Sequence, residues 1–382
     1  MNNMIDKTKE VRFSFSMNNE QENQLLSQVI SWLRFPLILL VVFIHCPGLP
    51  ELRPWIPITS VHDCMLNIYN VSRSLVNPGL TRIAVPMFFI ISGYLFFANI
   101  KTLDKEAYTR KISSRIKSLL LPYLAWNIMF ALFYAVYSFH KGVSFNLFDL
   151  KLFWGFSSAP TTNILGQTIL VYYPIHNVLW FVRDLFILSL LTPMIFILAK
   201  RLKLFLPIIA IALYVFNIWS SYFFISVASF CFFTLGGYFG IQKWNLIVCT
   251  RHIEKKTYVL GGLFLCLSVW LICNNHSCSP INNISCILEI IMTFNIASRI
   301  IEHKCLRIPK QLSNCTFFIY ASHTLNGFNQ ITPLLIPAIL PTIFYPLFWL
   351  LTPIAKTLFS IVLYMTLKKI LPGIAKFLNG YR

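Results

Sequence analysis

The sequence predicts an all-α fold: a polytopic bundle of about ten transmembrane helices with both termini in the cytoplasm. Three observations predict it. First, 57% of the 382 residues are hydrophobic, 12% are charged and the mean hydropathy is +0.67. A soluble domain of this size does not need so much apolar surface. Second, the apolar residues form continuous runs instead of alternating, which favours membrane helices over a barrel. Third, Lys and Arg gather in every second loop.

Ten apolar runs approach the roughly 20 residues that a helix needs to cross a bilayer. They are 29–46, 82–99, 116–138, 177–199, 203–219, 224–241, 257–273, 283–300, 314–336 and 347–369. The ninth run has a polar outer half, and the fifth and sixth are joined by a very short turn. We therefore expect one transmembrane domain over residues 29–370. Cytoplasmic tails would cover residues 1–28, which we expect to be disordered, and residues 371–382.

The distribution of positive charge sets the predicted orientation. With the N-terminus inside, most of the 32 Lys and Arg lie in cytoplasmic segments, and the outer loops hold few. This agrees with the positive-inside rule at every loop. The net charge of +19 therefore indicates topology, and nucleic acid is not an expected partner. The protein is predicted to be a multi-pass protein of the cell membrane, with membrane lipid around it.

The first apolar run, SWLRFPLILLVVFIHC at residues 31–46, carries Arg34 near one end and His45 near the other. Eleven residues at about 100° each leave roughly 20° of rotation, so both side chains share one helix face, about 16 Å apart. An arginine at membrane depth costs about 3 kcal/mol on insertion scales, so it usually faces protein, water or a ligand. Two interpretations stay open. Arg34 snorkels to the headgroups while His45 caps the outer end, or the face lines a path with an anion site inside and a base outside.

Few other ionisable side chains fall within the predicted spans: Arg82, Arg183, Asp184, Glu289, His323 and Lys356. Asp184 and Glu289 are expected about 10 Å below the outer surface, near the level of His45. A base with two carboxylates is one interpretation, and a structural ion-pair network is the other, which we prefer for Glu289. Asp184 follows Arg183 directly, so the two are not assumed to pair. His323 fits a hydrogen-bonded core position better than a ligand position.

Two predicted outer loops, at 47–81 and 140–176, are long. The second is rich in aromatic residues and low in charge. Long loops often carry function. The aromatic side chains suit either stacking on a glycan or anchoring at the membrane interface.

Five short motifs, in order along most of the chain, resemble the membrane-bound acyltransferase family 3, with its acyltransferase-3 domain of the O-acetyltransferase type. The first is Arg-x10-His at Arg34 and His45. The others are RIAVPMFFIISGYLF with Arg82 and Ser92, LLLPYLAW with Pro122, LWFVRDLF with Trp180 and Arg183, and LSNCTFFIYASH with Ser313, Tyr320 and His323.

The resemblance implies an enzyme that transfers an acyl group, here expected to be acetyl, from a cytoplasmic acyl-CoA such as acetyl-CoA. The acceptor would be a hydroxyl of an extracytoplasmic carbohydrate or lipid-linked glycan, the reaction a form of polysaccharide modification by O-acetylation. His45 is the expected base, because an imidazole can take a proton near neutral pH.

A base normally has an orienting partner, and the candidates are Asp184, Glu289 and Asp63. The remaining assignments divide into donor contacts at Arg34, Arg82 and Ser92, and acceptor contacts at Arg183, Trp180 and His323. For Ser92, close helix packing is the favoured alternative. No metal is expected, since no His or Cys spacing is typical of a metal site. Direct transfer and an acyl relay through His45 both stay open, as does the oligomeric state.

The rival function is a transporter or flippase without covalent chemistry, in which the buried charges form a proton or substrate path.

Overall fold

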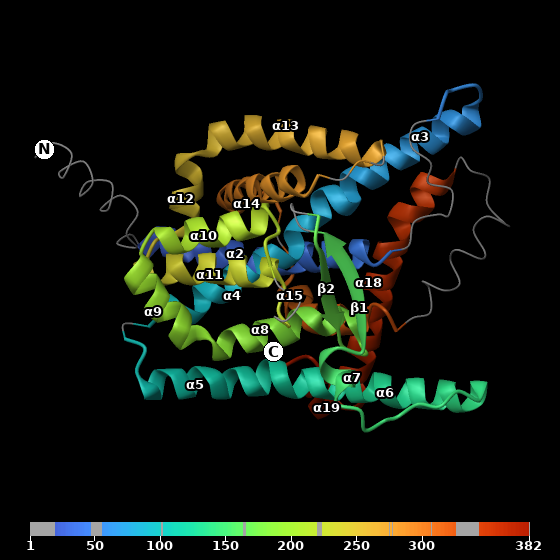
Figure 1. Cartoon of the computed structure of the whole chain (residues 1–382), viewed down its shortest axis with the longest axis horizontal. Coiled ribbons are helices and arrows are strands. Elements are labelled where there is room, and N and C mark those ends of the chain that lie inside the picture. The colour runs from blue at the N-terminus through green and yellow to red at the C-terminus, as the bar shows by residue number, and fades with distance from the viewer. Residues whose placement is uncertain are drawn as a thin grey trace, which may run out of the picture.

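The computed structural model describes residues 20–46, 56–100, 102–162, 166–219, 224–274, 276, 278–306, 308–325 and 344–381. Most of this chain is helical; several of the longer helices, among them α5, α6 and α13, run close to the long axis of the molecule, whereas α18 crosses it steeply (Figure 1). The elements before the hairpin are α2 (Glu20–Ile44), α3 (Val61–Ser74), η1 (Leu75–Gly79), η2 (Leu80–Ile83), α4 (Ala84–Phe97), α5 (Lys105–Arg115), η3 (Ile116–Leu120), α6 (Leu121–Lys141) and α7 (Lys151–Trp154).

After the strands β1 (Ser157–Thr162) and β2 (Thr168–Tyr173), helices follow to the end of the described chain. They are η4 (Asn177–Leu179), α8 (Trp180–Leu190), α9 (Thr192–Leu202), α10 (Phe205–Val215), α11 (Val227–Gln242), α12 (Leu246–His252), α13 (Glu254–Cys273), α14 (Ser279–Glu302), α15 (Lys310–Asn314), α16 (Thr316–Ser322), α18 (Tyr345–Ile370) and α19 (Pro372–Leu378). In Figure 1, α2, α4 and α11 lie between α13 with α14 on one side and α5 with α6 on the other.

The described helices confirm a multi-pass helical membrane protein. Six helical segments are long and apolar enough to cross a bilayer, and a seventh forms if α8 and α9, bent by 63° at their junction, count as one. Two expected spans, 203–219 and 224–241, correspond to the shorter helices α10 and α11. The outer half of the expected span 314–336, beyond residue 325, lies outside the described residues.

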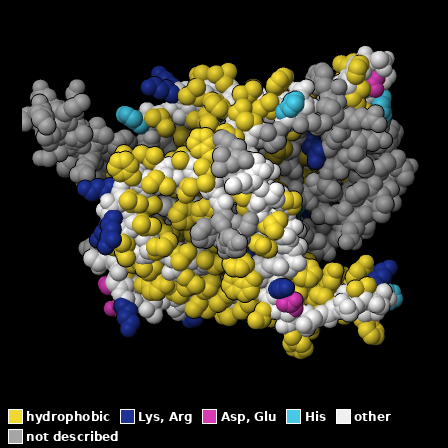
Figure 2. Space-filling view, viewed as in Figure 1, with side chains coloured by type: hydrophobic (Ala, Val, Ile, Leu, Met, Phe, Trp, Pro, Cys, Tyr) yellow, Lys and Arg dark blue, Asp and Glu magenta, His cyan; other side chains and the backbone are white. Residues whose placement is uncertain are grey.

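The surface agrees with a bilayer environment. Apolar side chains cover the middle of the face shown in Figure 2, and most Lys and Arg lie toward its edges. The exposed apolar side chains include Leu132 and Phe133 on α6, Leu263 on α13 and Leu358 on α18. A soluble monomer rarely exposes apolar patches of this extent. A helix that faces lipid, in contrast, exposes apolar side chains to the lipid tails.

Both ends of the described chain are helical. Helix α2 begins at Glu20, inside the segment expected to be a disordered tail, of which residues 1–19 lie outside the described part. The C-terminal helix α19 packs against the bundle. The Asn379 amide donates to the Asn314 carbonyl at 2.7 Å, and the Trp126 indole donates to the Leu378 carbonyl at 3.0 Å.

The segment predicted as the second outer loop contains a two-stranded antiparallel hairpin that we did not expect. Strand β1 pairs with β2 so that Ser157 lies opposite Tyr173. The β2 sequence, TILVYY, is rich in β-branched and aromatic residues, which favour strands. The segment predicted as the first outer loop holds α3, whose N-cap is Ser60. The Ser60 hydroxyl accepts from the Asp63 amide at 3.2 Å, and the half-buried Asp63 carboxylate accepts from the Thr59 and Ser60 hydroxyls, so Asp63 supports the first turn of the helix.

Helices α4 and α11 cross with their backbones in close contact, and glycines make this possible. A Cβ added at Gly93 would lie 2.1 Å from the Phe233 carbonyl oxygen, and one at Gly236 would lie 2.0 Å from the Ile90 carbonyl oxygen. No real side chain tolerates such distances to backbone, so a methyl group forces the helices apart. For Gly93, the packing expectation is confirmed, because small residues allow helices to approach closely in membranes.

We therefore expect Gly236→Ala to reduce the amount of folded protein severely. The matched control is Gly262→Ala, because a Cβ at Gly262 has no neighbour within 4 Å. Alanine favours a helix over glycine by about 1 kcal/mol, so the control should be neutral or slightly stabilising. Size-exclusion profiles and melting temperatures in detergent measure both variants. Equal folding of the two variants would show that the crossing is not tightly constrained.

Candidate active site

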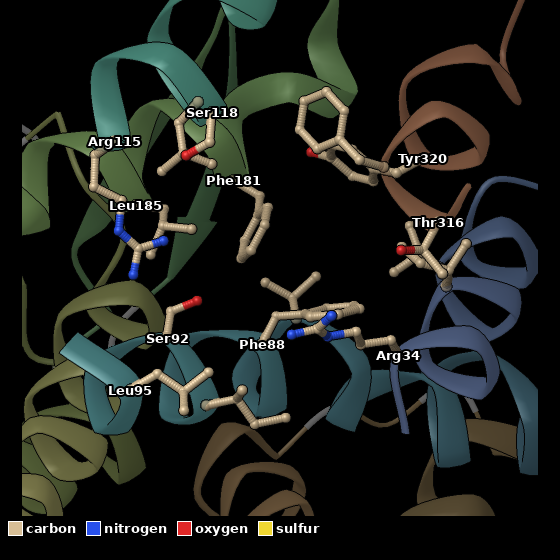
Figure 3. A pocket seen from close by; sticks show the side chains of 16 residues that line it. Arg34, Phe88, Ser92, Leu95, Arg115, Ser118, Phe181, Leu185, Thr316 and Tyr320 are labelled. Carbon is tan, nitrogen blue, oxygen red and sulfur yellow. The ribbon is translucent and has the colours of Figure 1, made fainter. Parts of the chain in front are cut away.

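A cavity of about 250 Å³ lies among α2, α4, α8, α16 and the junction of α5 with η3 (Figure 3). Its walls are mostly apolar and include Phe88, Phe181 and Leu185. Two arginines, Arg34 from α2 and Arg115 from the end of α5, also line it, and no Asp or Glu does. The cavity therefore combines an apolar interior with two positive charges.

The two arginines have no protein partner in the part of the chain that the structure describes. Neither guanidinium makes a hydrogen bond or an ion pair there. They enter the cavity from different walls, with the hydroxyl of Ser92 between them in Figure 3. Both side chains are half-buried, and a guanidinium group against apolar walls without a protein partner is costly. This arrangement is suited to an anionic ligand, because guanidinium groups bind phosphate and carboxylate through paired hydrogen bonds.

One face of α2 connects this cavity to His45. Arg34, Ile38 and Val41 all line the cavity, and they lie on one helix face at the spacing i, i+4, i+7. Val41 is the last residue of that face that lines the cavity, and His45 comes four residues later in the chain. Three positions of the expected common face are therefore open to the cavity, and the place of His45 on that face stays a prediction. His45 itself follows the last residue of α2.

His323 packs directly on His45. Their ring centroids are 5.1 Å apart with the planes at 46°. The Nδ1 atom of His323 lies 2.7 Å from the Tyr320 carbonyl oxygen, and its Nε2 atom is buried without a hydrogen-bond partner among the described residues. Tyr320 lines the cavity and donates its hydroxyl to the Val178 carbonyl. His323 thus lies between the cavity wall and His45.

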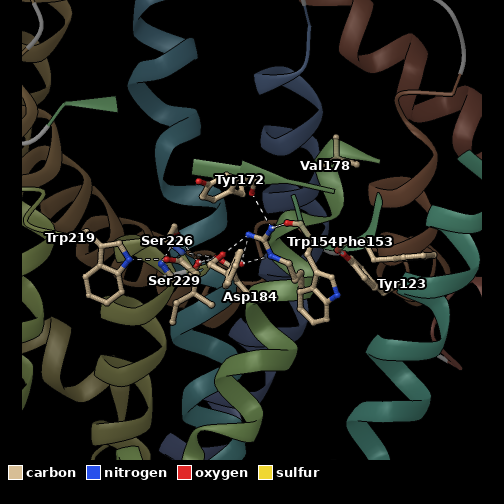
Figure 4. Close-up of polar contacts among 12 residues, drawn as sticks. Tyr123, Phe153, Trp154, Tyr172, Val178, Asp184, Trp219, Ser226 and Ser229 are labelled. Atoms are coloured by element: carbon tan, nitrogen blue, oxygen red, sulfur yellow. Dashed lines mark hydrogen bonds and ion pairs between the residues drawn. The ribbon is translucent and has the colours of Figure 1, made fainter. Parts of the chain in front are cut away.

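Asp184 and Arg183, near the start of α8, connect this helix to neighbouring loops (Figure 4). These neighbours, whose pairing the sequence left open, form a buried ion pair with an Nη2–Oδ1 distance of 2.8 Å. The Arg183 guanidinium also donates to the Trp154, Tyr172 and Phe224 carbonyls at 2.7 to 2.9 Å.

The second Asp184 oxygen accepts from the Ser226 amide at 2.9 Å and from the Ser229 hydroxyl at 2.7 Å. Every nitrogen and oxygen atom of the two charged groups therefore takes part in a hydrogen bond. Together these bonds connect α8 to α7, to β2 and to the start of α11. Among the described residues, neither Asp184 nor Glu289 makes a hydrogen bond or ion pair with His45.

Glu289 and Arg82 belong to the interface of α14 with its neighbours. The Ser285 hydroxyl donates to the Glu289 carboxyl group at 2.5 Å, and Thr293 donates to its carbonyl. The Arg82 guanidinium donates to the Pro78, Gly79 and Asn282 carbonyls and to the Ser268 hydroxyl, all at 2.8 to 2.9 Å. All three nitrogens of Arg82 donate to these groups and Arg82 does not line the cavity, so it fixes the turn before α4.

Of the remaining assigned residues, Ser92 lines the cavity, whereas Trp180 packs on the hydrophobic core. Reasoning from the sequence missed Arg115, which was counted only as a cytoplasmic charge. It also left Lys356 without a role and did not place His323 beside His45. Within the described residues, no cluster of three His, Cys, Asp or Glu side chains could hold a metal ion.

The fold and the cavity define a class: a polytopic helical membrane protein with a largely apolar cavity lined by two arginines, and with two histidines packed on each other elsewhere in the bundle. A family model described as an acyltransferase domain matches residues 28–367, and the chain belongs to this acyltransferase family.

Two curated relatives show partial similarity. The succinoglycan biosynthesis protein ExoH of Rhizobium meliloti (strain 1021) is 28% identical over 177 residues, 46% of this chain and 44% of that protein. A serine/alanine racemase of Enterococcus gallinarum is 27% identical over 167 residues, 40% of this chain and 21% of that protein. The chain thus spans less than half the length of these relatives. No solved structure matches it.

Proposed function

We propose that this protein is an integral membrane O-acyltransferase. It moves an acyl group, in the simplest case acetyl, from a cytoplasmic acyl-CoA to a hydroxyl of an extracytoplasmic carbohydrate. One observation carries the proposal. Arg34 on α2 lines a cavity that holds two guanidinium groups without a described protein partner, and His45 directly follows the last residue of the same helix.

The cavity suits the donor. Arg34 and Arg115 would hold phosphate groups of the acyl-CoA, for which a planar guanidinium is the preferred partner. The apolar walls at Ile38, Val41 and Phe181 would surround the uncharged arm that bears the thioester. The reactive end then points along α2 toward His45.

The acceptor hydroxyl would meet His45. The imidazole takes the hydroxyl proton while the oxygen forms a bond to the thioester carbonyl carbon. The carbon–sulfur bond breaks, and the sulfur leaves as the thiol after accepting that proton back from the imidazolium. A relay through an acyl-imidazole is the other form of the mechanism. The buried Nε2 atom of His323, with its ring against that of His45, provides a second group beside the reaction.

The sidedness is part of the proposal. Ten spans with both termini in the cytoplasm agree with the distribution of Lys and Arg. In this orientation Arg34 lies toward the cytoplasmic supply of acyl-CoA and His45 toward the outer surface. The relative named for succinoglycan biosynthesis supports a polysaccharide or lipid-linked glycan as the acceptor.

The test is transfer from labelled acetyl-CoA by the purified protein in liposomes. We expect release of free CoA that depends on the protein, together with label on the acceptor glycan. Mass spectrometry of surface glycans should show an acyl mass that is lost when the gene is deleted. The transporter alternative predicts glycan movement without thioester consumption. That result would overturn the proposal.

A further inference from the structure

A lysine buried in the membrane part of the molecule lies against His45. Lys356, in the middle of α18, is 0% exposed, and its ammonium donates to the His45 carbonyl oxygen at 3.3 Å. An ionisable side chain within a transmembrane helix is costly and usually has a functional reason. The mechanism proposed above gives Lys356 no role, so its position requires an explanation.

The first observation is how the end of α2 is held. The carbonyls of its last turn are capped by side chains from other elements. The Asn77 amide, in η1, lies 3.4 Å from both the Phe43 and Ile44 carbonyl oxygens. The Lys356 ammonium binds the next carbonyl, that of His45. Because the carboxyl end of a helix carries partial negative charge, an ammonium there is stabilising. The backbone of His45 is therefore fixed from two sides.

The second observation is the charge around the imidazole. The titratable groups near the His45 ring, among the described residues, are His323 from α16, Lys356 from α18 and the adjacent Cys46, with His176 behind His323. The described carboxylates make no hydrogen bond or ion pair with it. A nearby ammonium disfavours a second positive charge, so it favours the neutral imidazole that can accept a proton.

We propose that Lys356 is a positioning residue for His45. Its ammonium fixes the carboxyl end of α2 so that the His45 ring faces His323, and its charge adds to the effect of burial in disfavouring a second positive charge on that ring. The inference rests on the proposed function, since it takes His45 as the base. Lys356 itself contacts neither substrate in this account.

The variants are Lys356→Met, which keeps most of the volume, and Lys356→Arg, which keeps the charge. The matched control is Thr357→Val, because Thr357 is the next residue and its hydroxyl bonds only within α18, to the Pro353 carbonyl at 2.8 Å. For Lys356→Met we expect kcat to fall about 10- to 100-fold with KM for acetyl-CoA unchanged. The acidic limb of its pH–rate profile should move to higher pH by about one unit. Lys356→Arg should restore the profile, and Thr357→Val should match the wild type.

A second readout does not depend on catalysis. Diethyl pyrocarbonate modifies neutral imidazole, and mass spectrometry can follow its reaction at His45 across pH. The pH dependence should also shift upward in Lys356→Met. Should this shift occur in a protein that transfers no acyl group, the inference stands and the proposed function fails. If Lys356→Met folds normally, transfers acyl groups and shows neither shift, the lysine is only structural and the inference is overturned.

Discussion

Replacing His45 with glutamine should lower acyl transfer about 10²- to 10⁴-fold, the usual contribution of general-base catalysis. Glutamine keeps a polar side chain of similar reach but cannot take a proton. Donor binding should be unchanged, because Arg34 lies about 16 Å away along α2. Transfer of label from acetyl-CoA measures the first quantity, and equilibrium binding of labelled CoA measures the second. Loss of both together would indicate misfolding instead of a catalytic defect.

The control for His45 is His140→Gln, at the exposed end of α6. This substitution makes the same chemical change at a surface position and should leave the transfer rate at the wild-type level. A folded His45→Gln protein with full activity would exclude His45 as base and as relay. In that case, the acyl-transfer rates of Lys356 and His323 variants could not be explained by an effect on His45.

Removing either cavity arginine should weaken donor binding. Hydrogen bonds to charged groups contribute about 1.5 to 3 kcal/mol. We therefore expect Arg34→Met and Arg115→Met each to raise KM for acetyl-CoA by about 10- to 100-fold. The effect on kcat should be much smaller, since neither guanidinium reaches His45. Arg34→Lys should recover only part of the loss, because an ammonium lacks the planar fork.

A phosphate-free donor makes this test specific. The wild type should strongly prefer acetyl-CoA over an acetyl thioester of pantetheine, and the two arginine variants should lose that preference. The control is Arg110→Met in α5, since Arg110 is exposed and lies 3.9 Å from Glu106 in a surface ion pair. If Arg34→Met and Arg115→Met keep the wild-type preference, the phosphates bind elsewhere.

The helix period made the main feature of the site predictable. Arg34, Ile38 and Val41 share one face of α2 because their spacing follows the helix period, and His45 was predicted to follow on that face by the same rule. The position of Arg115 could not be predicted in the same way. It precedes the π-helical turn η3, which shifts the register between α5 and α6, so the face toward the cavity does not follow from periodicity.

The roles of the charged pairs depended on distant backbone. Arg183 binds the carbonyls of Trp154, Tyr172 and Phe224, which lie up to 41 residues away in sequence. No local pattern indicates such partners, so Asp184 looked available for catalysis. Likewise, the apolar run at 224–241 was long enough for a span, yet α11 reaches only 16 residues. Hydropathy measures composition, whereas helix ends depend on caps such as Ser226, whose hydroxyl accepts from the Ser229 amide.

The glycine crossing of α4 with α11 makes one side of the donor chamber rigid. Phe88, Ser92 and Leu95 form that side, and they are carried by a helix whose backbone already touches its neighbour. A bulky ligand therefore cannot enter the cavity by displacing α4. Any widening must come from the opposite side, where Arg115, Ser118 and Leu119 sit at an irregular turn that interrupts a long helix. The cavity thus has one wall held by backbone contact and an opposite wall at an irregular helical turn, and that second wall carries Arg115.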